Sequence, residues 1–283
     1  MTAAIRSSAG GAGPRRSQVD RVFRGTTRVM AAAVVALLVL LALQLLLSSR
    51  EAFERFGLGF VVSAEWDAVK DLYGALPFVA GTVLSAVIAL VIAAPIGLMT
   101  AIFLAELAPR HVAAPLVFAI ELLAAIPSVV YGLWGVFVLS PFLKDTVESW
   151  VTETFGWVPF LAGPTFGVGL FAAGVILAIM ILPTIVSISR EVISSIPAQQ
   201  HEAMYALGAT QWEMVTRAIL PAARSGIVGA LILGLGRALG ETMAVTMVIG
   251  NAQEVPKSLF GPAQTIASQI ATTFNEAHVG LNT

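Results

Sequence analysis

The sequence predicts an all-α protein, a polytopic bundle of helices that crosses a membrane several times. Hydrophobic residues make up 57% of the 283 residues, charged residues 12%, and the mean hydropathy is +0.87. A soluble domain carries about 25% charged residues, so this composition excludes one. Five apolar runs also approach or exceed the roughly 20 residues that a helix needs to cross a bilayer. The predicted spans are about Val29–Leu47, Phe78–Leu104, Ala113–Leu139, Gly163–Ser189 and Ile227–Ile249.

Charge and cysteine content exclude several classes of function. The net charge of −1 provides no basic surface, so nucleic acid is not an expected partner. The chain has no cysteine, which rules out disulfides, thiolate catalysis and cysteine-ligated metals. The histidines, His111, His201 and His278, are far apart in the sequence. We therefore predict no metal site and interpret each histidine as a loop residue.

The first apolar run is predicted to be a retained signal-anchor helix. It is too long for a cleaved signal peptide, and Ser48–Ser49 is followed by Arg50, not by a small residue that would complete a cleavage site. Residues 1–25, rich in Gly, Ala, Ser and Arg, predict a disordered tail, and residues 26–283 form the membrane domain. Lys and Arg predominate in the tail and in the 190–224 segment. The positive-inside rule therefore places both, and the N-terminus, in the cytoplasm.

Arg237 lies near the middle of the fifth predicted span, one helical turn before Glu241. An arginine at the bilayer centre costs roughly 2.5–3.5 kcal/mol on insertion scales. Positions four apart share a helix face, so the two residues could partly neutralise one another as a structural ion pair. Intramembrane charges usually mark transport paths, which favours the alternative of an anion path. Two further carboxylates are expected to be structural: Glu121 paired with a neighbouring helix or the interface, and Glu106 solvated at a helix end.

The segment between the fourth and fifth spans predicts a docking element, residues 194–223. Pro197 fits the start of a short helix that runs through Ala206. Gly208 can supply a backbone reversal. A second helix, about Thr210–Leu220, would then lead to Pro221.

This segment resembles the coupling loop of ABC importer permeases. The pattern there is E-A-A, three residues, G, nine residues and I-x-L-P. Met204 and Ala218 depart from it, but the spacing is kept. The residues that match are Glu202, Ala203, Gly208, Leu220 and Pro221.

Three further segments narrow the resemblance to the permeases of phosphate-specific ABC importers, in particular their C-type subunit. They are EWDAVKDLYGALPFVAGTVLSAVIALVIAAPIGLMTAIFLAELAP (Glu65–Pro109), AIPSVVYGLWGVFVL (Ala125–Leu139) and GLGRALGETMAVTMVIGN (Gly234–Asn251). The resemblance covers roughly residues 56–280. Arg237 and Glu241 fall inside the third segment.

The resemblance implies a type I ABC importer permease fold in the bacterial cytoplasmic membrane. The chain would move inorganic phosphate inward, with Arg237 and Glu241 in the substrate path. It would pair with a homologous second permease, two ATPase subunits held through the 194–223 loop, and an extracytoplasmic phosphate-binding protein. No G-x-x-x-x-G-K-[ST] motif is present. ATP is therefore expected to be bound and hydrolysed on partner chains, and this chain is expected to be neither an enzyme nor a cofactor binder.

The C-terminal segment departs from the family pattern, which has a sixth span. Residues 251–283 contain no apolar run long enough to cross, so an external loop with a short surface helix within Leu259–Phe274 is expected. The sequence is accordingly expected to stop before the last helix. Two alternatives stay open: an ABC permease for another oxyanion, such as molybdate or a phosphonate, and a secondary anion carrier that needs no ATPase.

Overall fold

The computed structural model describes residues 14–67, 70 and 72–274, and every regular element among them is helical. This confirms the predicted all-α class. Helices at Gln18–Ser48, Leu76–Leu107, Leu170–Ser194 and Gln211–Gly240 are each long and apolar enough to cross a membrane. A bent pair, Arg110–Ala125 with Ser128–Phe155, supplies a fifth candidate span.

The N-terminal unit contains helix α1 (Pro14–Ser48) and the short helix α2 (Arg50–Phe56). Proline suits a helix start because its missing N–H is not needed there. Residues 14–25, for which the sequence predicted a disordered tail, are therefore helical, and residues 1–13 of that tail lie outside the described residues. The apolar side chains of α1 are exposed within the unit, as expected for a helix in contact with lipid.

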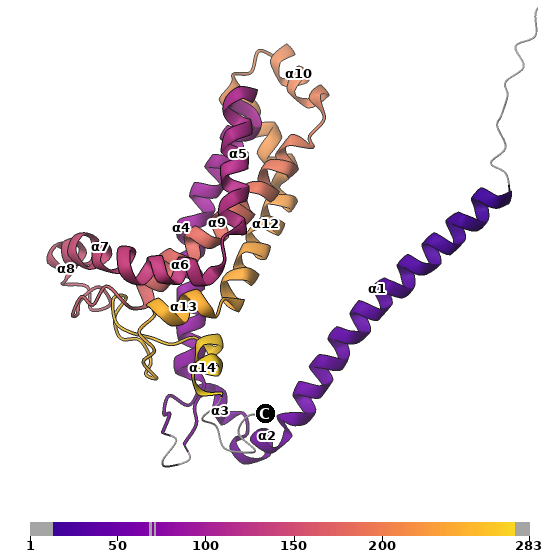
Figure 1. The fold of residues 1–283 in the computed structure, drawn as a ribbon. Coiled ribbons are helices and arrows are strands. Elements are labelled where there is room, and N and C mark those ends of the chain that lie inside the picture. Colours follow the sequence, from indigo (N-terminus) through magenta and orange to yellow (C-terminus); the bar gives the residue numbers. More distant parts are fainter. Residues whose placement is uncertain (1–13, 68–69, 71, 275–283) are drawn as a thin grey trace, which may run out of the picture. The chain divides into compact units, whose positions relative to one another are not determined.

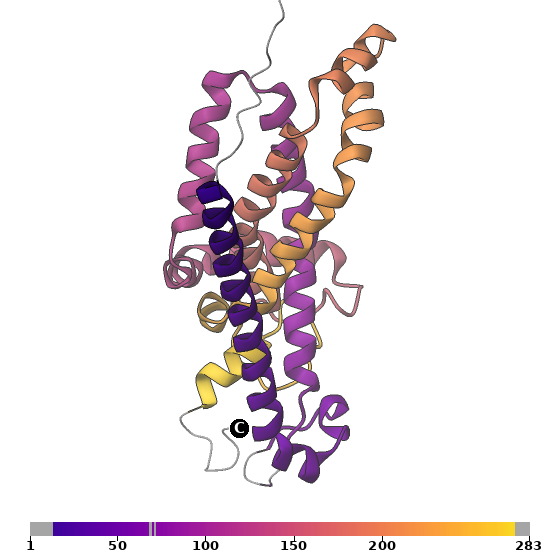
Figure 2. The same cartoon turned by 90° about the vertical axis from the view of Figure 1, so that its right-hand side faces the viewer.

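The second unit is built around α9 (Leu170–Ser194), which packs against α4 (Leu76–Ile102) and α12 (Leu220–Gly240). These long helices lie side by side in both views (Figures 1 and 2). Small residues allow the close approach that membrane helices need. A Cβ added at Gly174 of α9 would lie 2.4 Å from Cγ2 of Ile88 on α4. The predicted fourth span, Gly163–Ser189, corresponds to α9, but both of its predicted ends lie several residues too early in the sequence.

The third predicted span, Ala113–Leu139, is wrong as a single helix. Helix α5 (Arg110–Ala125) ends before Pro127, and α6 (Ser128–Trp134) leaves at 92°. A proline disfavours helical backbone at the preceding residue, and Ile126 is indeed extended, with ψ of 129°. The hydroxyl of Tyr131 donates to the carbonyl of Leu123 at 2.8 Å, which links α6 to the last turn of α5 across the break.

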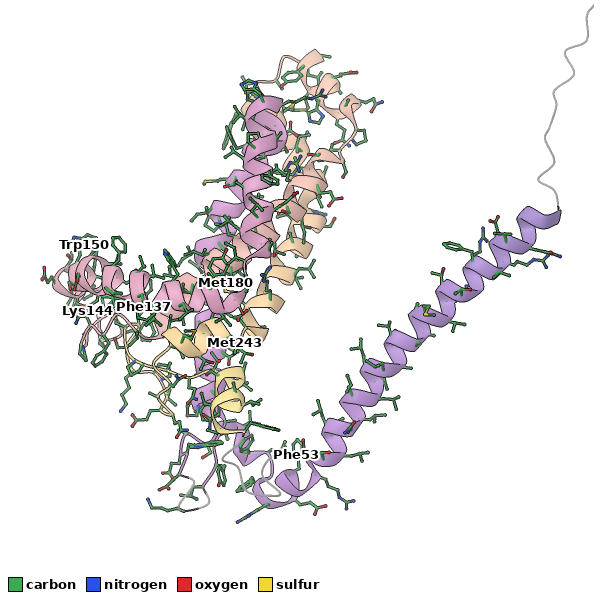
Figure 3. All side chains as sticks on the ribbon, viewed as in Figure 1. Phe53, Phe137, Lys144, Trp150, Met180 and Met243 are labelled. Carbon is green, nitrogen blue, oxygen red and sulfur yellow. The ribbon has the colours of Figure 1, made fainter. Side chains whose placement is uncertain are left out.

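Beyond α6 the chain continues as a helical arm that projects sideways from the bundle (Figure 1). Phe137, Lys144 and Trp150 mark its course in Figure 3. The arm consists of a π-helical stretch Gly135–Leu139, α7 (Ser140–Phe142), a second π-helical stretch Leu143–Glu148, and α8 (Ser149–Phe155).

The fifth predicted span, Ile227–Ile249, is also wrong in its bounds. A continuous helical segment runs over Gln211–Gly240, through α11 (Gln211–Met214), a π-helical stretch Val215–Ile219 and α12. The helix breaks at Glu241, and a separate short helix α13 (Met243–Val248) follows. The second helix predicted in the docking loop is therefore the first part of this span.

The segment after α13, predicted to be an external loop with a short helix, is packed against the bundle. Phe260 and Gln264 are almost fully buried. Backbone N–H groups at the start of α9, on Leu170 and Phe171, donate to carbonyl groups of this segment at 3.0 Å. The predicted short helix is present as α14 (Ile266–Thr273), and residues 275–283 lie outside the described part.

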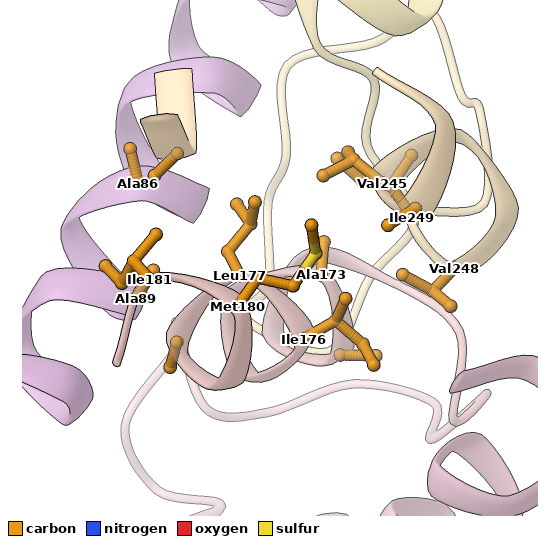
Figure 4. Close-up of a cluster of buried hydrophobic side chains, with 14 of the residues drawn as sticks. Ala86, Ala89, Ala173, Ile176, Leu177, Met180, Ile181, Val245, Val248 and Ile249 are labelled. Atoms are coloured by element: carbon orange, nitrogen blue, oxygen red, sulfur yellow. The ribbon is translucent and has the colours of Figure 1, made fainter. Parts of the chain in front are cut away.

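One apolar core joins α4, α9 and α13 (Figure 4). Its centre contains side chains of all three elements: Ala86, Ala89, Ala173, Ile176, Leu177, Met180, Ile181, Val245, Val248 and Ile249. A second cluster joins the other end of α4 to α9, α11 and α12. The remaining elements of this unit are α3 (Gly59–Val62), a π-helical stretch Phe103–Leu107 that extends α4, and α10 (Ala198–Ala206).

Candidate functional site: a helix break beside Arg237

Arg237 lies in the last turn of α12, immediately before the break. Its Nη1 donates to Oγ1 of Thr184 on α9 at 3.2 Å, and Arg237 is half-buried. A guanidinium has five N–H donors. Among the described residues, Arg237 forms no other hydrogen bond and no ion pair. The side chain is thus positioned by α9 and keeps most of its donors available.

Glu241 does not share a helix face with Arg237, contrary to the sequence interpretation. It follows Gly240, the last residue of α12, and has an extended backbone with ψ of 129°. Residues four apart share a face only within one helix, so Arg237 and Glu241 do not. Its Oε1 accepts a hydrogen bond from the N–H of Ala244 at 3.3 Å, which caps the start of α13. The structural ion pair between the two residues is absent from the described structure.

The two helix breaks lie close to one another in the fold. Helix α6, which follows the first break, packs on α13, which follows the second. A Cβ added at Gly132 of α6 would lie 2.6 Å from Sδ of Met247 and 3.1 Å from Cα of Ala244. Met180 of α9 and Met243 of α13 are labelled near this junction in Figure 3.

A polar face continues from Thr184 along α9. Thr184, Ser187, Glu191 and Ser194 are spaced by three or four residues, the spacing of one helix face. A cavity of about 420 Å³ begins at Ser187 and is lined by Glu121 of α5 together with Ser187, Arg190, Glu191, Ser194 and Ser195. The Nε of Arg190 is buried there without a hydrogen-bond partner. Glu121, expected to pair with a neighbouring helix or the interface, lines this cavity and forms no ion pair within the described residues.

The docking loop has the local structure that the sequence predicted. Helix α10 follows Pro197 and ends at Ala206, and Gly208 has a φ of +79°, which side chains disfavour. Glu202, Ala203 and Gly208 are exposed, whereas Leu220 and Pro221 begin α12. Large apolar side chains are exposed beside them: Leu207 is 84% and Trp212 is 74% exposed. Large apolar side chains exposed at the docking loop favour contact with another protein.

Sequence reasoning missed two features. The first is Thr184, which accepts a hydrogen bond from Arg237. In the sequence Thr184 is only a hydroxyl residue next to Pro183 within an apolar run. Glu106, expected to be solvated, has a side chain only 8% exposed and contacts His201. No periodicity in the sequence relates either pair, because each joins elements far apart in the chain.

Known proteins resemble this chain over most of its length. The profile of the family "Binding-protein-dependent transport system inner membrane component" matches residues 93–271. The "Phosphate transport system permease protein PstC" of Mesorhizobium japonicum is 46% identical over 278 residues, covering 97% of this chain and 85% of the relative. The protein of the same name from Haemophilus influenzae is 47% identical over 263 residues, covering 92% and 84%.

A more distant relative is similar over a shorter region. The "Probable phosphate transport system permease protein PstC" of Methanocaldococcus jannaschii is 38% identical over 231 residues, covering 80% of this chain and 73% of the relative. The family profile spans α9, the docking loop, α12 and both helix breaks. The chain belongs to the family of binding-protein-dependent transport system inner membrane components.

Proposed function

We propose that the chain is the membrane-spanning permease subunit of an ATP-driven importer for inorganic phosphate. One observation carries this proposal: a half-buried arginine at a helix break is positioned by Thr184, while most of its donors have no acceptor among the residues that the structure describes. The planar guanidinium matches the oxygen geometry of phosphate. The names of the relatives, which are 38–47% identical, agree with this substrate.

Phosphate would be bound at the break by Arg237 through charge-assisted hydrogen bonds. One carboxylate oxygen of Glu241 already caps α13, so its second oxygen could accept a hydrogen bond from a protonated phosphate oxygen. A fully ionised sulfate offers no such proton. Phosphate would then leave along the polar face of α9 and through the cavity beside Arg190.

ATP hydrolysis would take place on two partner ATPase subunits, which hold the loop at Glu202, Ala203 and Gly208. The exposed Leu207 and Trp212 would enter the same interface. A homologous second permease would complete the membrane part, and a phosphate-binding protein would deliver substrate from outside. The positive-inside rule favours a cytoplasmic N-terminus and a cytoplasmic docking loop.

The test is uptake of radiolabelled phosphate into proteoliposomes that contain the assembled complex and enclose ATP. Arg237→Gln should abolish uptake while the ATPase subunits still co-purify. Arg224→Gln is the matched control, because Arg224 is exposed on the same helix, and it should leave uptake unchanged. Normal uptake by Arg237→Gln would remove Arg237 from the path.

The same assay separates the alternatives. Uptake of molybdate or a phosphonate in place of phosphate would indicate an importer for another oxyanion. Uptake that vanadate does not inhibit, and that needs no ATPase subunit, would indicate a secondary carrier.

A further inference from the structure

The docking loop is attached to α4 by a contact between Glu106 and His201. Nε2 of His201, on α10, lies 3.1 Å from Oε2 and 3.3 Å from Oε1 of Glu106, which ends the helical extension of α4. The side chains are 24% and 8% exposed, so water screens this contact less than a surface pair. Both carboxylate oxygens are within hydrogen-bonding reach of one ring nitrogen, which donates to them in the tautomer that carries its proton at Nε2.

A second hydrogen bond attaches the other arm of the loop to the same place. Nε2 of Gln211, the first residue of α11, donates to the backbone carbonyl of Glu106 at 3.3 Å. Met204 of α10 also packs on the apolar cluster that contains Ala101 of α4. The parts of the loop before and after Gly208 are thus both attached to the end of α4.

These contacts matter because α4 is not adjacent to the docking loop in the sequence. The backbone continues from α9 into α10 and from α11 into α12, so a displacement of the loop reaches α9 and α12 directly. The displacement can reach the end of α4 beside the docking loop only through side-chain packing and side-chain hydrogen bonds. Packed elements shift as units when a directional, partly buried contact joins them.

We infer that Glu106 and His201 are positioning residues that make α4 move together with the docking loop when the ATPase subunits close. Neither residue touches the substrate. The inference rests on the proposed function, since it assigns a role within an ATP-driven cycle. It adds a specific contact, between Glu106 and His201, that attaches the docking loop to a span that does not neighbour the loop in the sequence.

The first experiment measures phosphate imported per ATP hydrolysed by the reconstituted complex. Glu106→Ala and His201→Ala should each lower this ratio about tenfold, the factor expected from losing one hydrogen bond to a charged group. The double variant should be no worse than either single one, because both remove the same contact. His111→Ala and Glu153→Ala, at exposed positions, are the matched controls and should keep the wild-type ratio. A wild-type ratio in both single variants, or additive losses in the double variant, would overturn the inference.

The second experiment does not depend on the substrate. The chain has no cysteine, so spin labels can be placed on cysteines introduced at Met99 of α4 and Gln199 of α10, both exposed. In the wild-type background the distribution of distances between the labels should stay narrow with and without ATP and vanadate, and it should broaden in Glu106→Ala and His201→Ala. Equal widths in all three backgrounds would contradict the inference. If the wild-type complex moved no phosphate but kept the narrow distance distribution, the proposed function would be wrong. The role inferred for the contact between Glu106 and His201 would then be retained.

Discussion

Arg237 Nη1 and Thr184 Oγ1 lie 3.2 Å apart, which joins the last turn of α12 to the middle of α9 beside a helix break. Thr184 accepts one hydrogen bond and leaves the remaining donors of the guanidinium directed away from it. A carboxylate in that place would neutralise the charge, whereas a hydroxyl positions the charge and preserves it. This difference separates an arginine that can bind an anion from one that only packs a bundle.

Thr184→Val should weaken phosphate uptake without abolishing it. Valine keeps the branched shape but cannot accept the hydrogen bond, so Arg237 loses its orientation and keeps its charge. The expected effect is a rise of about tenfold in KM, equivalent to about 1.4 kcal/mol. Thr100→Val is the control, because Oγ1 of Thr100 donates only to its own helix, at the carbonyl of Ile96. An unchanged KM would show that Arg237 needs no support from α9.

Substitutions at Glu241 should separate its two assigned roles. Glu241→Gln keeps an oxygen that can cap the N–H of Ala244, so the fold should persist while phosphate uptake and discrimination against sulfate both fall. Glu241→Ala removes the cap as well and should lower stability by about 1 kcal/mol. Phosphate uptake in the presence of competing sulfate measures the first effect, and thermal unfolding in detergent measures the second. Full selectivity in Glu241→Gln would leave Glu241 as a helix cap alone.

Gly132→Ala should loosen the junction of α6 with α13. The added methyl group would lie 2.6 Å from Sδ of Met247 and 3.1 Å from backbone of Ala244, so helix positions must shift. Overpacking of this kind costs about 1–3 kcal/mol. Circular dichroism during heating should show a lower unfolding temperature. Gly229→Ala on α12, with no atom within 4 Å of its added methyl, should not lower it. Equal unfolding temperatures for the two variants would contradict the close packing.

Trp212→Ala should reduce binding of the ATPase subunits. Trp212 is 74% exposed beside the docking loop, so its removal leaves the core intact and removes apolar contact area from the expected interface. Co-purification of the ATPase subunits measures the loss. Trp157→Ala is the matched control, because Trp157 is 80% exposed in the segment after α8. Equal loss in both variants, or in neither, would argue against a role of Trp212 in ATPase binding.

Local signals in the sequence predicted several elements closely. Pro197 and Gly208 delimit α10 because proline fits a helix start and glycine tolerates a positive φ, and neither effect needs a tertiary partner. Apolar length likewise predicted α4 and α9, since a bilayer requires it irrespective of neighbours. The same length argument could not find the breaks at Pro127 and Glu241. Hydropathy averages over a window and stays high through a break that apolar residues flank.

The sequence by itself determined the fold class, the spans that contain α1, α4 and α9, and the local structure of the docking loop, because these follow from composition, length and local backbone preference. The tertiary structure alone decided which side chains meet. It paired Arg237 with Thr184 and not with Glu241, brought Glu106 to His201, and buried the segment around Phe260 against α9. Such pairs depend on how helices distant in the chain pack together, and the break after Gly240 removed the local geometry that the four-residue spacing presupposed.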